Sequence, residues 1–451
     1  MAANVQSAGA RSPLNDRVAS GLFALLRDST LFLYITSLFT SHGLDLLVGS
    51  ERTPSIGTAP AGDIFTQLIV TSLLFIGIAW HVVHRTSISR VLLIAWPLVL
   101  PIIWLLLSAT WSGMPDISVR RAARLSMEVG AVILFAAAYS GNSIRLMRVL
   151  YLSFAFILLL DVALLAFPTV SFSPLGYNGV HPGKNQTGAF CFLAIPLFVL
   201  AFFNPRIFPT RLISVAFALL SVVILLISQS KTALALVIVC PFLTLAFVLL
   251  GRSRPVTAGV VIAMLILANF LFWTVLTDTG IGEFLTATIG DPTFTGRDRI
   301  WDYALYRFRQ APLVGHGYGS IWHVGEDLNP VLANFGYTPM AGQAHNGYLD
   351  VMAQLGLVGL VLLLMFLAVT IYRLWITTPL IRDSGIALFA IYLTLGIMLY
   401  DITESNLLRS GAENWLLFLL VVYTAHMTAS GSLARKLRLG AQASDLRALR
   451  P

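Results

Sequence analysis

Residues 294–310 read FTGRDRIWDYALYRFRQ, a basic stretch in a chain that is otherwise built from apolar segments. The stretch belongs to the only long polar interruption of the sequence, which runs from residue 277 to residue 345. On both sides of it, apolar segments alternate with short turns, and about 20 apolar residues are enough to cross a bilayer as a helix. This contrast predicts an all-α, polytopic integral membrane protein with one large loop outside the membrane.

The composition excludes a soluble globular protein. Hydrophobic residues make up 57% of the chain and charged residues 11%, with a mean hydropathy of +0.82, whereas a soluble chain carries about 25% charged residues. The net charge of +8 does not indicate nucleic-acid binding, because no basic block or basic–aromatic interleaving accompanies it. Cys191 and Cys240 both lie in apolar segments, so we expect buried thiols and neither a disulfide framework nor a metal cluster.

Hydrophobic windows predict about twelve transmembrane helices. The predicted spans are residues 29–49, 63–83, 91–110, 122–140, 145–167, 186–203, 211–228, 232–250, 256–276, 346–372, 384–404 and 412–429. They divide the chain into five parts: a cytoplasmic N-terminal tail (1–28), transmembrane helices 1–9 (29–276), the large loop (277–345), transmembrane helices 10–12 (346–429) and a basic cytoplasmic C-terminal tail (430–451). The first span is expected to remain uncleaved, because no small-residue cleavage site follows it.

The basic residues predict the orientation. Most of the 29 Lys and Arg residues fall on connections at one side of the predicted helices: Arg11, Arg17, Arg27, Arg85, Arg90, Arg145, Arg148, Arg206, Arg211, Arg252, Arg254, Arg373, Arg382, Arg435, Lys436, Arg438, Arg447 and Arg450. Cytoplasmic loops carry such an excess. We therefore expect both termini in the cytoplasm and the large loop on the outer side.

A smaller group of cations is left on the outer side: Arg52, Arg120, Arg121, Arg124, Lys184, Lys231, Arg297, Arg299, Arg307, Arg309 and Arg409. Cations on the translocated side run against the topological bias, so another role for them is indicated. Together they suit an anionic ligand held at the lipid interface, such as a lipid-linked diphosphate. For any single one, snorkelling beside lipid head groups is an equal alternative.

Residues 294–310 are predicted to form a helix along the outer surface. Apolar positions recur at helical spacing: Ile300, Ala304, Leu305 and Phe308. Thr295 and Asp298 match a capping box, and Arg297 falls in the first turn, where free N–H groups and the helix dipole favour an anion. The alternative is an amphipathic surface helix whose Arg297 pairs with Asp298 or with lipid.

His345 and Asn346 lie where the loop re-enters the membrane. Asn346 is a good helix N-cap. His345 would lie at the outer rim, and its near-neutral pKa in the free amino acid suits a general base. A histidine at an interface is also a common amphipathic anchor, but its position at the end of the large loop favours a functional role.

Two short outer turns also carry lysines. Ser230 and Lys231 belong to a turn between two spans, where an ammonium and a hydroxyl would bind one phosphate; small polar residues also suit any such turn. Lys184, in the stretch His181-Pro182-Gly183-Lys184-Asn185, is a weaker candidate of the same kind.

The remaining polar features favour structural roles. The cluster Gly315-His316-Gly317-Tyr318-Gly319 is interpreted as tight turns, and Arg409 is placed beside Glu404 and Asn406, where an ion pair would explain it. Three carboxylates lie in or near predicted spans, where a charge is costly and is therefore either functional or paired: Glu128, Asp161 and Asp401.

Taken together, the polar motifs resemble those of the bacterial O-antigen polymerase and O-antigen ligase family, including the exopolysaccharide polymerases. The matching stretches are Gly183-Lys184-Asn185, Ser228-x-Ser230-Lys231-Thr232, Thr295-Gly296-Arg297 with Ile300-Trp301, Gly315-x-Gly317-Tyr318-Gly319, and His345-Asn346-x-Tyr348-Leu349 followed by Leu355-Gly356-Leu357-x-Gly359. Family members often carry arginine after the second serine of the Ser-x-Ser motif, where this chain has Lys231. With Lys184, this departure looks closer to the exopolysaccharide polymerase branch.

The resemblance implies glycosyl transfer at the outer face of the bacterial inner membrane, from an oligosaccharide on undecaprenyl diphosphate to a glycan or a lipid A core acceptor. By likeness, His345 and Arg297 would be catalytic, with His345 deprotonating the acceptor hydroxyl. Lys231, Lys184, Arg299 and Ser230 would help to bind the diphosphate. Fixed cations would stabilise the leaving group, so we expect no cofactor, no metal and an inverted anomeric centre.

The resemblance favours a repeat-unit polymerase, with a ligase to lipid A core as the nearest alternative. A flippase and a chain-length regulator of the same pathway are possible partners, and no nucleic acid is expected. A transporter would explain Glu128, Asp161 and Asp401 as lining residues, but transporters often show repeated halves and broken helices at the midplane. A scaffold subunit of an export complex would tolerate substitution of His345.

Overall fold

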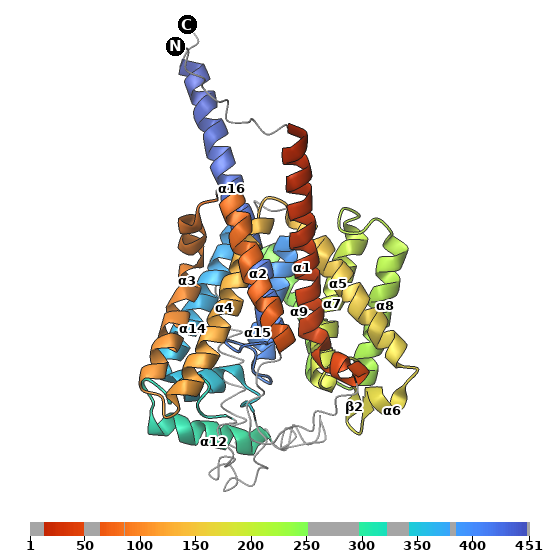
Figure 1. The fold of residues 1–451 in the computed structure, drawn as a ribbon, viewed down its shortest axis with the longest axis vertical. Coiled ribbons are helices and arrows are strands. Elements are labelled where there is room, and N and C mark those ends of the chain that lie inside the picture. The colour runs from red at the N-terminus through yellow and green to blue at the C-terminus, as the bar shows by residue number, and fades with distance from the viewer. Residues whose placement is uncertain are drawn as a thin grey trace, which may run out of the picture.

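The computed structural model describes residues 13–48, 64–84, 86–250, 297–322, 342–378 and 385–448, and within these ranges the protein is a bundle of long helices (Figure 1). Eight helices in the described ranges are long and apolar enough to cross a membrane. They are parts or all of α1 (Pro13–Val48), α3 (Ile88–Leu107) with η1 (Ser108–Thr110), α4 (Pro115–Tyr139), α5 (Ser143–Leu164), α7 (Lys184–Phe203), α8 (Arg211–Ser228), α9 (Lys231–Leu250) and α14 (Gly347–Thr377).

Three further helices complete the bundle: α2 (Ile64–Val83), α15 (Ile386–Tyr400) and α16 (Glu413–Ala448). Buried apolar residues from these helices and from the eight above form one continuous core. The chain is thus a polytopic, α-helical membrane protein, as predicted. The span predicted at residues 256–276, and the tails at 1–12 and 449–451, lie outside the described residues.

Most predicted spans coincide with helices, but several helices differ from the predicted ends, and α15 and α16 show two different reasons. Helix α15 ends at Tyr400, although the span was expected to continue to residue 404. It ends because the Asp401 carboxylate accepts hydrogen bonds from the backbone N–H groups of Asn406 and Leu407, at 2.8 and 2.9 Å. Helix α16 instead continues to Ala448, since hydropathy marks where a helix leaves apolar surroundings and not where its backbone hydrogen bonds stop.

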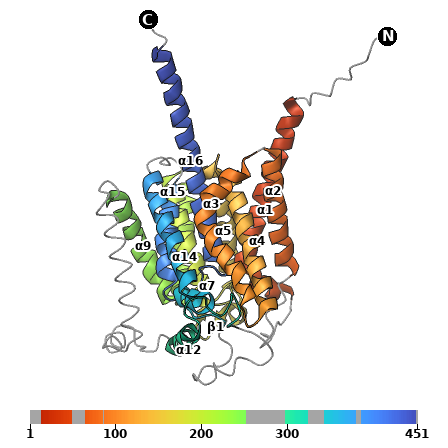
Figure 2. The ribbon, with the colours of Figure 1, turned by 90° about the vertical axis from the view of Figure 1, so that its left-hand side faces the viewer.

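Helix α12 (Arg297–Gln310) lies across one end of the bundle, and α1 and α16 extend from the opposite end (Figures 1 and 2). Its buried face is formed by Ile300, Trp301, Tyr303 and Ala304, which pack with residues at the start of α14. The predicted apolar stripe is therefore half correct, because Leu305 and Phe308 are only partly buried. The predicted capping residue Thr295 lies outside the described residues.

The glycine cluster after α12 is structural, as expected. Gly315, Gly317 and Gly319 all have positive φ, at 71°, 97° and 70°, a region that residues with a side chain rarely adopt. A Cβ on Gly315 would lie 2.3 Å from the carbonyl oxygen of Gln354 in α14, and one on Gly317 would lie 2.5 Å from Cβ of Ser112. These glycines let residues 311–322 pack closely between the starts of α4 and the α14 helix.

The segment between α5 and α7 is organised around Asp161, a fully buried residue of α5. Its carboxylate accepts hydrogen bonds from the N–H of Val180 at 3.0 Å and from Nε2 of His181 at 3.1 Å, and its carbonyl oxygen accepts one from the Tyr177 hydroxyl. The segment also contains α6 (Pro168–Ser171) and the antiparallel pair β1 (Phe172–Ser173) and β2 (Gly176–Tyr177). Asp161 is paired, and the contacts fix the start of α7 at Lys184.

The surroundings of Glu128 and of the two cysteines show whether these side chains have partners. Glu128 of α4 is paired with Arg124 at 3.0 Å and accepts hydrogen bonds from Ser410 and Gly411. Cys191 and Cys240 are free, buried thiols, as their apolar sequence context predicted.

Candidate functional site

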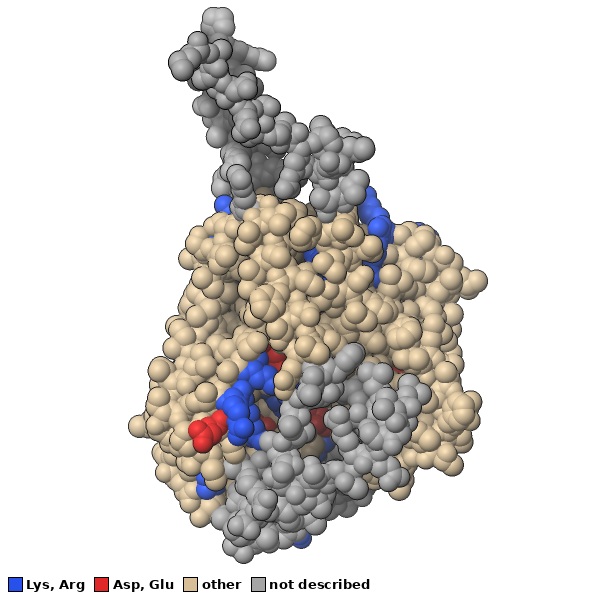
Figure 3. Space-filling model, viewed as in Figure 1, with Lys and Arg blue, Asp and Glu red and all other residues tan. Residues whose placement is uncertain are grey.

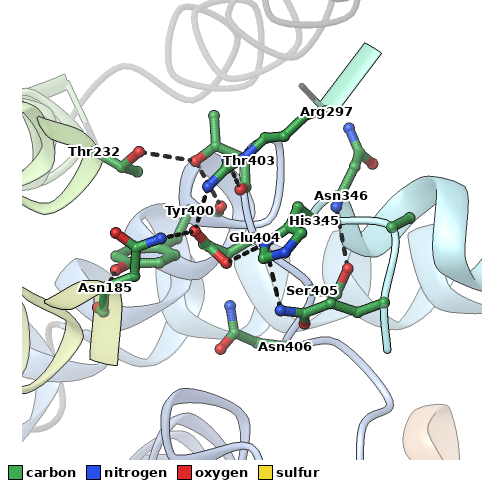
Figure 4. A network of polar contacts seen from close by, with 12 residues as sticks. Asn185, Thr232, Arg297, His345, Asn346, Tyr400, Thr403, Glu404, Ser405 and Asn406 are labelled. Atoms are coloured by element: carbon green, nitrogen blue, oxygen red, sulfur yellow. Dashed lines mark hydrogen bonds and ion pairs between the residues drawn. The ribbon is translucent and has the colours of Figure 1, made fainter. Parts of the chain in front are cut away.

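The candidate site is centred on Glu404, in the polar segment between α15 and α16 (Figure 4). Oε1 of Glu404 accepts hydrogen bonds from Nη2 of Arg297 at 2.7 Å and from Nδ2 of Asn185 at 2.9 Å. Its other oxygen, Oε2, lies 3.0 Å from Nδ1 of His345. One carboxylate thus joins α7, the start of α12 and the start of α14.

The environment of Glu404 favours its ionised form. Its side chain is only 11% exposed, and burial by itself raises the pKa of a carboxyl group. The hydrogen bond from His345 and the positive charge of Arg297 act in the opposite direction and are stronger, so the pKa of Glu404 is lowered from its usual value. A charged Glu404 can hold both partners in fixed orientations.

His345 lies two residues before the start of α14 and has a strained backbone. Its φ is 50°, in the left-handed region that favours glycine, and residues held in such conformations concentrate at functional sites. Asn346, next along the chain, caps α14 as predicted: its side-chain oxygen accepts a hydrogen bond from the N–H of Leu349 at 3.0 Å. The cap fixes the backbone on which the His345 side chain is mounted.

The two ring nitrogens of His345 have different surroundings. Nδ1 lies 3.0 Å from Oε2 of Glu404 and 3.3 Å from the Gln343 amide nitrogen, and no hydrogen-bond partner for Nε2 lies in the described part of the chain. In the tautomer in which Nδ1 donates to Glu404, Nε2 carries a free lone pair. The side chain is 30% exposed. This is the arrangement in which a carboxylate sets the tautomer of a histidine so that its other nitrogen can accept a proton.

Arg297 is the first residue of α12, and its guanidinium reaches the segment that follows α15. Nη1 donates to the carbonyl oxygen of Thr403 and Nη2 donates to Glu404. The side chain is 14% exposed. The guanidinium is thereby held next to His345, while the start of the helix contributes backbone N–H groups and a positive dipole end.

Helices α7 and α9 reach the same place. The hydroxyl of Tyr400 donates to the carbonyl oxygen of Asn185 at 3.2 Å, and the hydroxyl of Thr403 lies 3.2 Å from that of Thr232. Lys184 and Lys231, each next to one of these residues, are the first residues of α7 and α9. Lys184 is half-buried and Lys231 is exposed. The helix starts that carry both lysines therefore converge on the segment that holds Glu404.

The other two predicted ligand-binding residues are placed differently. Ser230 is 2% exposed, and a Cβ on Gly188 of α7 would lie 2.4 Å from Cβ of Ser230, so the residue is packed between helices. Arg299 is exposed on α12, two positions after Arg297, and residues two apart on a helix do not share a face. A role of either residue in ligand binding stays a prediction.

The structure corrects the expected partner of Glu404. An ion pair with Arg409 was expected from their proximity in sequence, but Glu404 is paired with Arg297 and His345, and Arg409 donates to the carbonyl oxygen of Ser405. Sequence reasoning also assigned no role to Asn185. The available signal was a carboxylate at the end of a predicted span, on the same side as Arg297 and His345.

Among the described residues, no group of three or more His, Cys, Asp and Glu side chains is arranged to hold a metal ion. The polar groups that converge here are instead a base with a free nitrogen, a carboxylate that orients it, and fixed cations. Such a set can remove a proton from a hydroxyl and stabilise negative charge on a departing group.

Two comparisons with known proteins found similar sequences. Residues 215–364 match the family described as O-antigen ligase. The chain is also similar to the exopolysaccharide production protein ExoQ of Rhizobium meliloti (strain 1021), with 28% identity over 275 residues. This match covers 58% of the chain and 61% of the relative. The family match contains Lys231, Arg297 and His345, whereas Glu404 lies beyond it.

Proposed function

We infer from the two matches that this chain belongs to the O-antigen ligase and polymerase family. From this premise we propose that it is a membrane glycosyltransferase that polymerises oligosaccharide repeat units, carried on undecaprenyl diphosphate, into exopolysaccharide or O-antigen. The observation that carries the proposal is the joining of Arg297 and His345 by Glu404. A base and an anion-binding group side by side are what a transfer from a diphosphate requires.

In the proposed reaction, an acceptor hydroxyl attacks the anomeric carbon of the donor sugar. Nε2 of His345 takes the hydroxyl proton, a new glycosidic bond forms, and the bond between the anomeric carbon and the diphosphate oxygen breaks. Undecaprenyl diphosphate leaves with its negative charge stabilised by Arg297, Lys231 and Lys184. Attack opposite the leaving group inverts the anomeric centre, and the cations make a divalent metal unnecessary.

Glu404 has a separate effect on Arg297 and on His345. Its carboxylate offsets the charge of Arg297 while no donor is bound, and it orients His345 through Nδ1. The two lysines then supply the excess of positive charge that a diphosphate needs. The lipid tail of the donor lies in the bilayer, so the sugar and the acceptor meet in a restricted geometry. Such positioning of the two reactants contributes much of the rate acceleration in reactions of this kind.

We place the site at the periplasmic face of the bacterial inner membrane, with both termini in the cytoplasm. Support comes from the opposite end of the bundle, where predicted cytoplasmic arginines gather: Nε of Arg145 contacts Asp28, and Nε of Arg148 donates to the carbonyl oxygen of Arg206 at 2.7 Å. Helix α12 lies at the other end (Figure 2). A flippase and a chain-length regulator remain proposed partners.

A ligase that transfers the finished polymer to lipid A core is the second candidate, because the matched family carries the description O-antigen ligase. The two reactions share donor chemistry and differ in the acceptor. A transporter is less well supported, since the carboxylates that would line a pathway are occupied: Glu128 by Arg124 and Asp161 by His181.

The test uses a deletion strain complemented with wild type, His345→Ala or Arg297→Ala at equal protein level in the membrane. His84→Ala is the matched control, because His84 is exposed on the opposite end of the bundle and stacks on Trp80. Undecaprenyl-linked glycans are then profiled by length. Single repeat units should accumulate in both site variants and not in the control. Long chains on undecaprenyl would indicate a ligase, and wild-type profiles would contradict a catalytic role.

A further inference from the structure

A second group of basic side chains lies on the outer end of the bundle, apart from the site around Glu404. It consists of Arg120, Arg121 and Arg124 of α4 and Arg409 of the segment between α15 and α16. Figure 3 shows Lys and Arg side chains gathered beside a hollow on this face, near the end of the bundle that α12 crosses. Glu404 and Arg409 are carried by the same short segment.

The segment is fastened to α4 through Glu128. The Glu128 carboxylate, 2% exposed, accepts hydrogen bonds from the Ser410 hydroxyl at 3.0 Å and the N–H of Gly411 at 2.9 Å. Arg124 pairs with it at 3.0 Å through Nε, while 42% of the arginine side chain is exposed. The edge of the Arg124 guanidinium that faces Glu128 is occupied, and the rest is accessible.

The turn that presents Arg409 is also held rigidly. Leu408 has φ of 53° and its carbonyl oxygen accepts a hydrogen bond from the Tyr318 hydroxyl at 2.9 Å. The Arg409 side chain is exposed, with one contact from Nη1 to the carbonyl oxygen of Ser405 at 3.3 Å. Arg121 donates to the carbonyl oxygen of Trp322 at 3.0 Å.

The four arginines share this end of the bundle with the carboxylates of Asp116, Glu128, Asp350 and Glu413, of which Glu128 and Asp350 already accept other hydrogen bonds. Arg121 lies within electrostatic range of both Arg120 and Arg409, and Nε of Arg120 contacts only a backbone carbonyl oxygen, that of Asp116. Both oxygens of Glu128 are already used. Asp350 and Glu413 also interact with Arg409 electrostatically, but Asp350 is buried and accepts hydrogen bonds from Trp322 and Ala344. Guanidinium groups held close together on an exposed surface are the usual receptor for phosphate oxygens.

The reaction proposed above needs two lipids, since donor and acceptor are each anchored in the membrane and each bears phosphate. The cations around Glu404 account for one of them. We propose that Arg120, Arg124 and Arg409 form a second anion-binding surface, which holds the phosphate of the acceptor lipid while the Arg297 site holds the donor diphosphate. This inference rests on the proposed function and assigns the acceptor to a defined surface of the chain.

The segment between α15 and α16 contributes residues to both surfaces and so fixes their positions relative to each other. Residues 404 to 411 contribute Glu404 to the donor site, and Arg409, Ser410 and Gly411 to the acceptor surface. Because Asp401 and Glu128 anchor this segment at its two ends, an acceptor lipid bound at Arg409 would place its sugar at a constant distance from His345.

The experiment counts bound lipid on the purified full chain in nanodiscs of phosphatidylcholine, with undecaprenyl diphosphate as the probe and native mass spectrometry as the readout. Wild type is expected to bind two equivalents. The double variant Arg120→Gln/Arg409→Gln, in which both residues are exposed, should weaken one equivalent by about tenfold or more and leave the other unchanged. Arg297→Gln should weaken the other equivalent. Arg90→Gln/Arg211→Gln, at the opposite end of the bundle, is the control and should retain both.

A single equivalent in wild type, lost in Arg297→Gln alone, would overturn the second surface and leave the proposed function standing. If Arg297→Gln keeps both equivalents while Arg120→Gln/Arg409→Gln loses one, the second surface stands and the proposed donor site fails. Adding phosphatidylglycerol to the nanodiscs separates the sources of phosphate. Displacement of the second equivalent by equimolar phosphatidylglycerol would show that the surface binds ordinary lipid head groups, which overturns an acceptor site.

Discussion

Each end of the bundle carries a carboxylate that joins an arginine to a second nitrogen-bearing side chain. At the end with the chain termini, Asp28 pairs with Arg27 at 2.9 Å, contacts Arg145 and accepts a hydrogen bond from the Tyr139 hydroxyl at 2.7 Å. At the other end, Glu404 joins Arg297, His345 and Asn185. The chemistry of the two clusters is almost the same.

The two clusters differ in how accessible their nitrogen-bearing side chains are. The Arg27 guanidinium is enclosed: its central carbon lies 3.9 Å from the ring centroid of Tyr139 and 4.6 Å from that of Trp80, and its side chain is 5% exposed. His345 instead is 30% exposed, has a strained backbone and keeps Nε2 free among the described residues. A cluster whose polar groups all have partners stabilises the fold. An accessible nitrogen without a partner, on a residue with a strained backbone, is typical of a reactive site.

The largest expected effect that would test this contrast is on turnover. Glu404→Gln keeps the size of the side chain but removes the charge that sets the His345 tautomer, so the turnover number should fall by about 10²-fold or more. Asp28→Asn should leave turnover per folded molecule within about twofold, because it acts only at the opposite end. The measurement is polymer formation from lipid-linked repeat units by purified protein, normalised to folded protein. Equal losses in both variants would remove the distinction.

The reverse expectation holds for stability. Asp28→Ala leaves Arg27 buried with only the Ala138 carbonyl oxygen and two aromatic rings as partners, and breaking a buried ion pair costs about 3–5 kcal/mol. Thermal unfolding in detergent should therefore occur at a clearly lower temperature. Glu404→Ala should destabilise less, because Arg297 keeps the Thr403 carbonyl oxygen as a partner and His345 is partly solvated. A larger loss in Glu404→Ala than in Asp28→Ala would contradict this reading of the two ends.

Much of the outer site was predictable from the sequence, and the reason is local. Arg297 lies in the first turn of a helix with a clear apolar stripe, and His345 precedes a residue that caps the next helix. Such features depend on neighbours within a few positions, so a single sequence shows them. The membrane-spanning helices were accessible for the same reason, since they follow from hydropathy within windows, while the orientation inferred from the arginines stays a prediction.

The role of Glu404 was not predictable in this way. Its partners Arg297 and His345 are 107 and 59 positions away in the sequence, and their meeting depends on how α12, α14 and α15 pack. Hydropathy placed Glu404 at the end of a span and proximity paired it with Arg409. The break of α15 at Tyr400 is caused by Asp401 binding backbone N–H groups ahead of it, and no periodicity signals that.

The dependence of stability on pH should differ between Asp401 and Glu404, the two carboxylates of this segment. Burial raises the pKa of Asp401 to about 7, so between pH 4 and pH 7 the folded state binds more protons than the unfolded state, and stability falls as pH rises. For Glu404 the lowered pKa has the opposite sign: its contribution is present above the usual glutamate pKa and is lost as pH falls through the lowered value.

Thermal unfolding of wild type and Asp401→Asn, measured from pH 4 to pH 8, tests this difference. Asp401→Asn should remove a fall in stability on the order of 3 kcal/mol across that range. Glu404→Gln, measured in the same way with the range extended to lower pH, should instead flatten the loss of stability that wild type shows as pH falls through the lowered pKa of Glu404. An unchanged slope in Asp401→Asn would mean that the N–H donors of Asn406 and Leu407 keep Asp401 ionised in the fold.

The smallest expected effect tests whether a strained backbone alone, without a functional side chain, matters for activity. Gln229 caps α8 with φ of 56°, close to the 50° of His345, but its side chain is exposed and has no hydrogen bond to Glu404, Arg297 or His345 among the described residues. Glycine avoids the steric cost of this conformation, so Gln229→Gly should raise the free energy of unfolding by about 0.5–1 kcal/mol and leave turnover unchanged. His345→Gly relieves the same strain yet should abolish activity. If Gln229→Gly also lost activity, the side chain of Gln229 or the rigidity of its turn would matter for turnover, and a strained backbone at this end of the bundle would no longer distinguish His345.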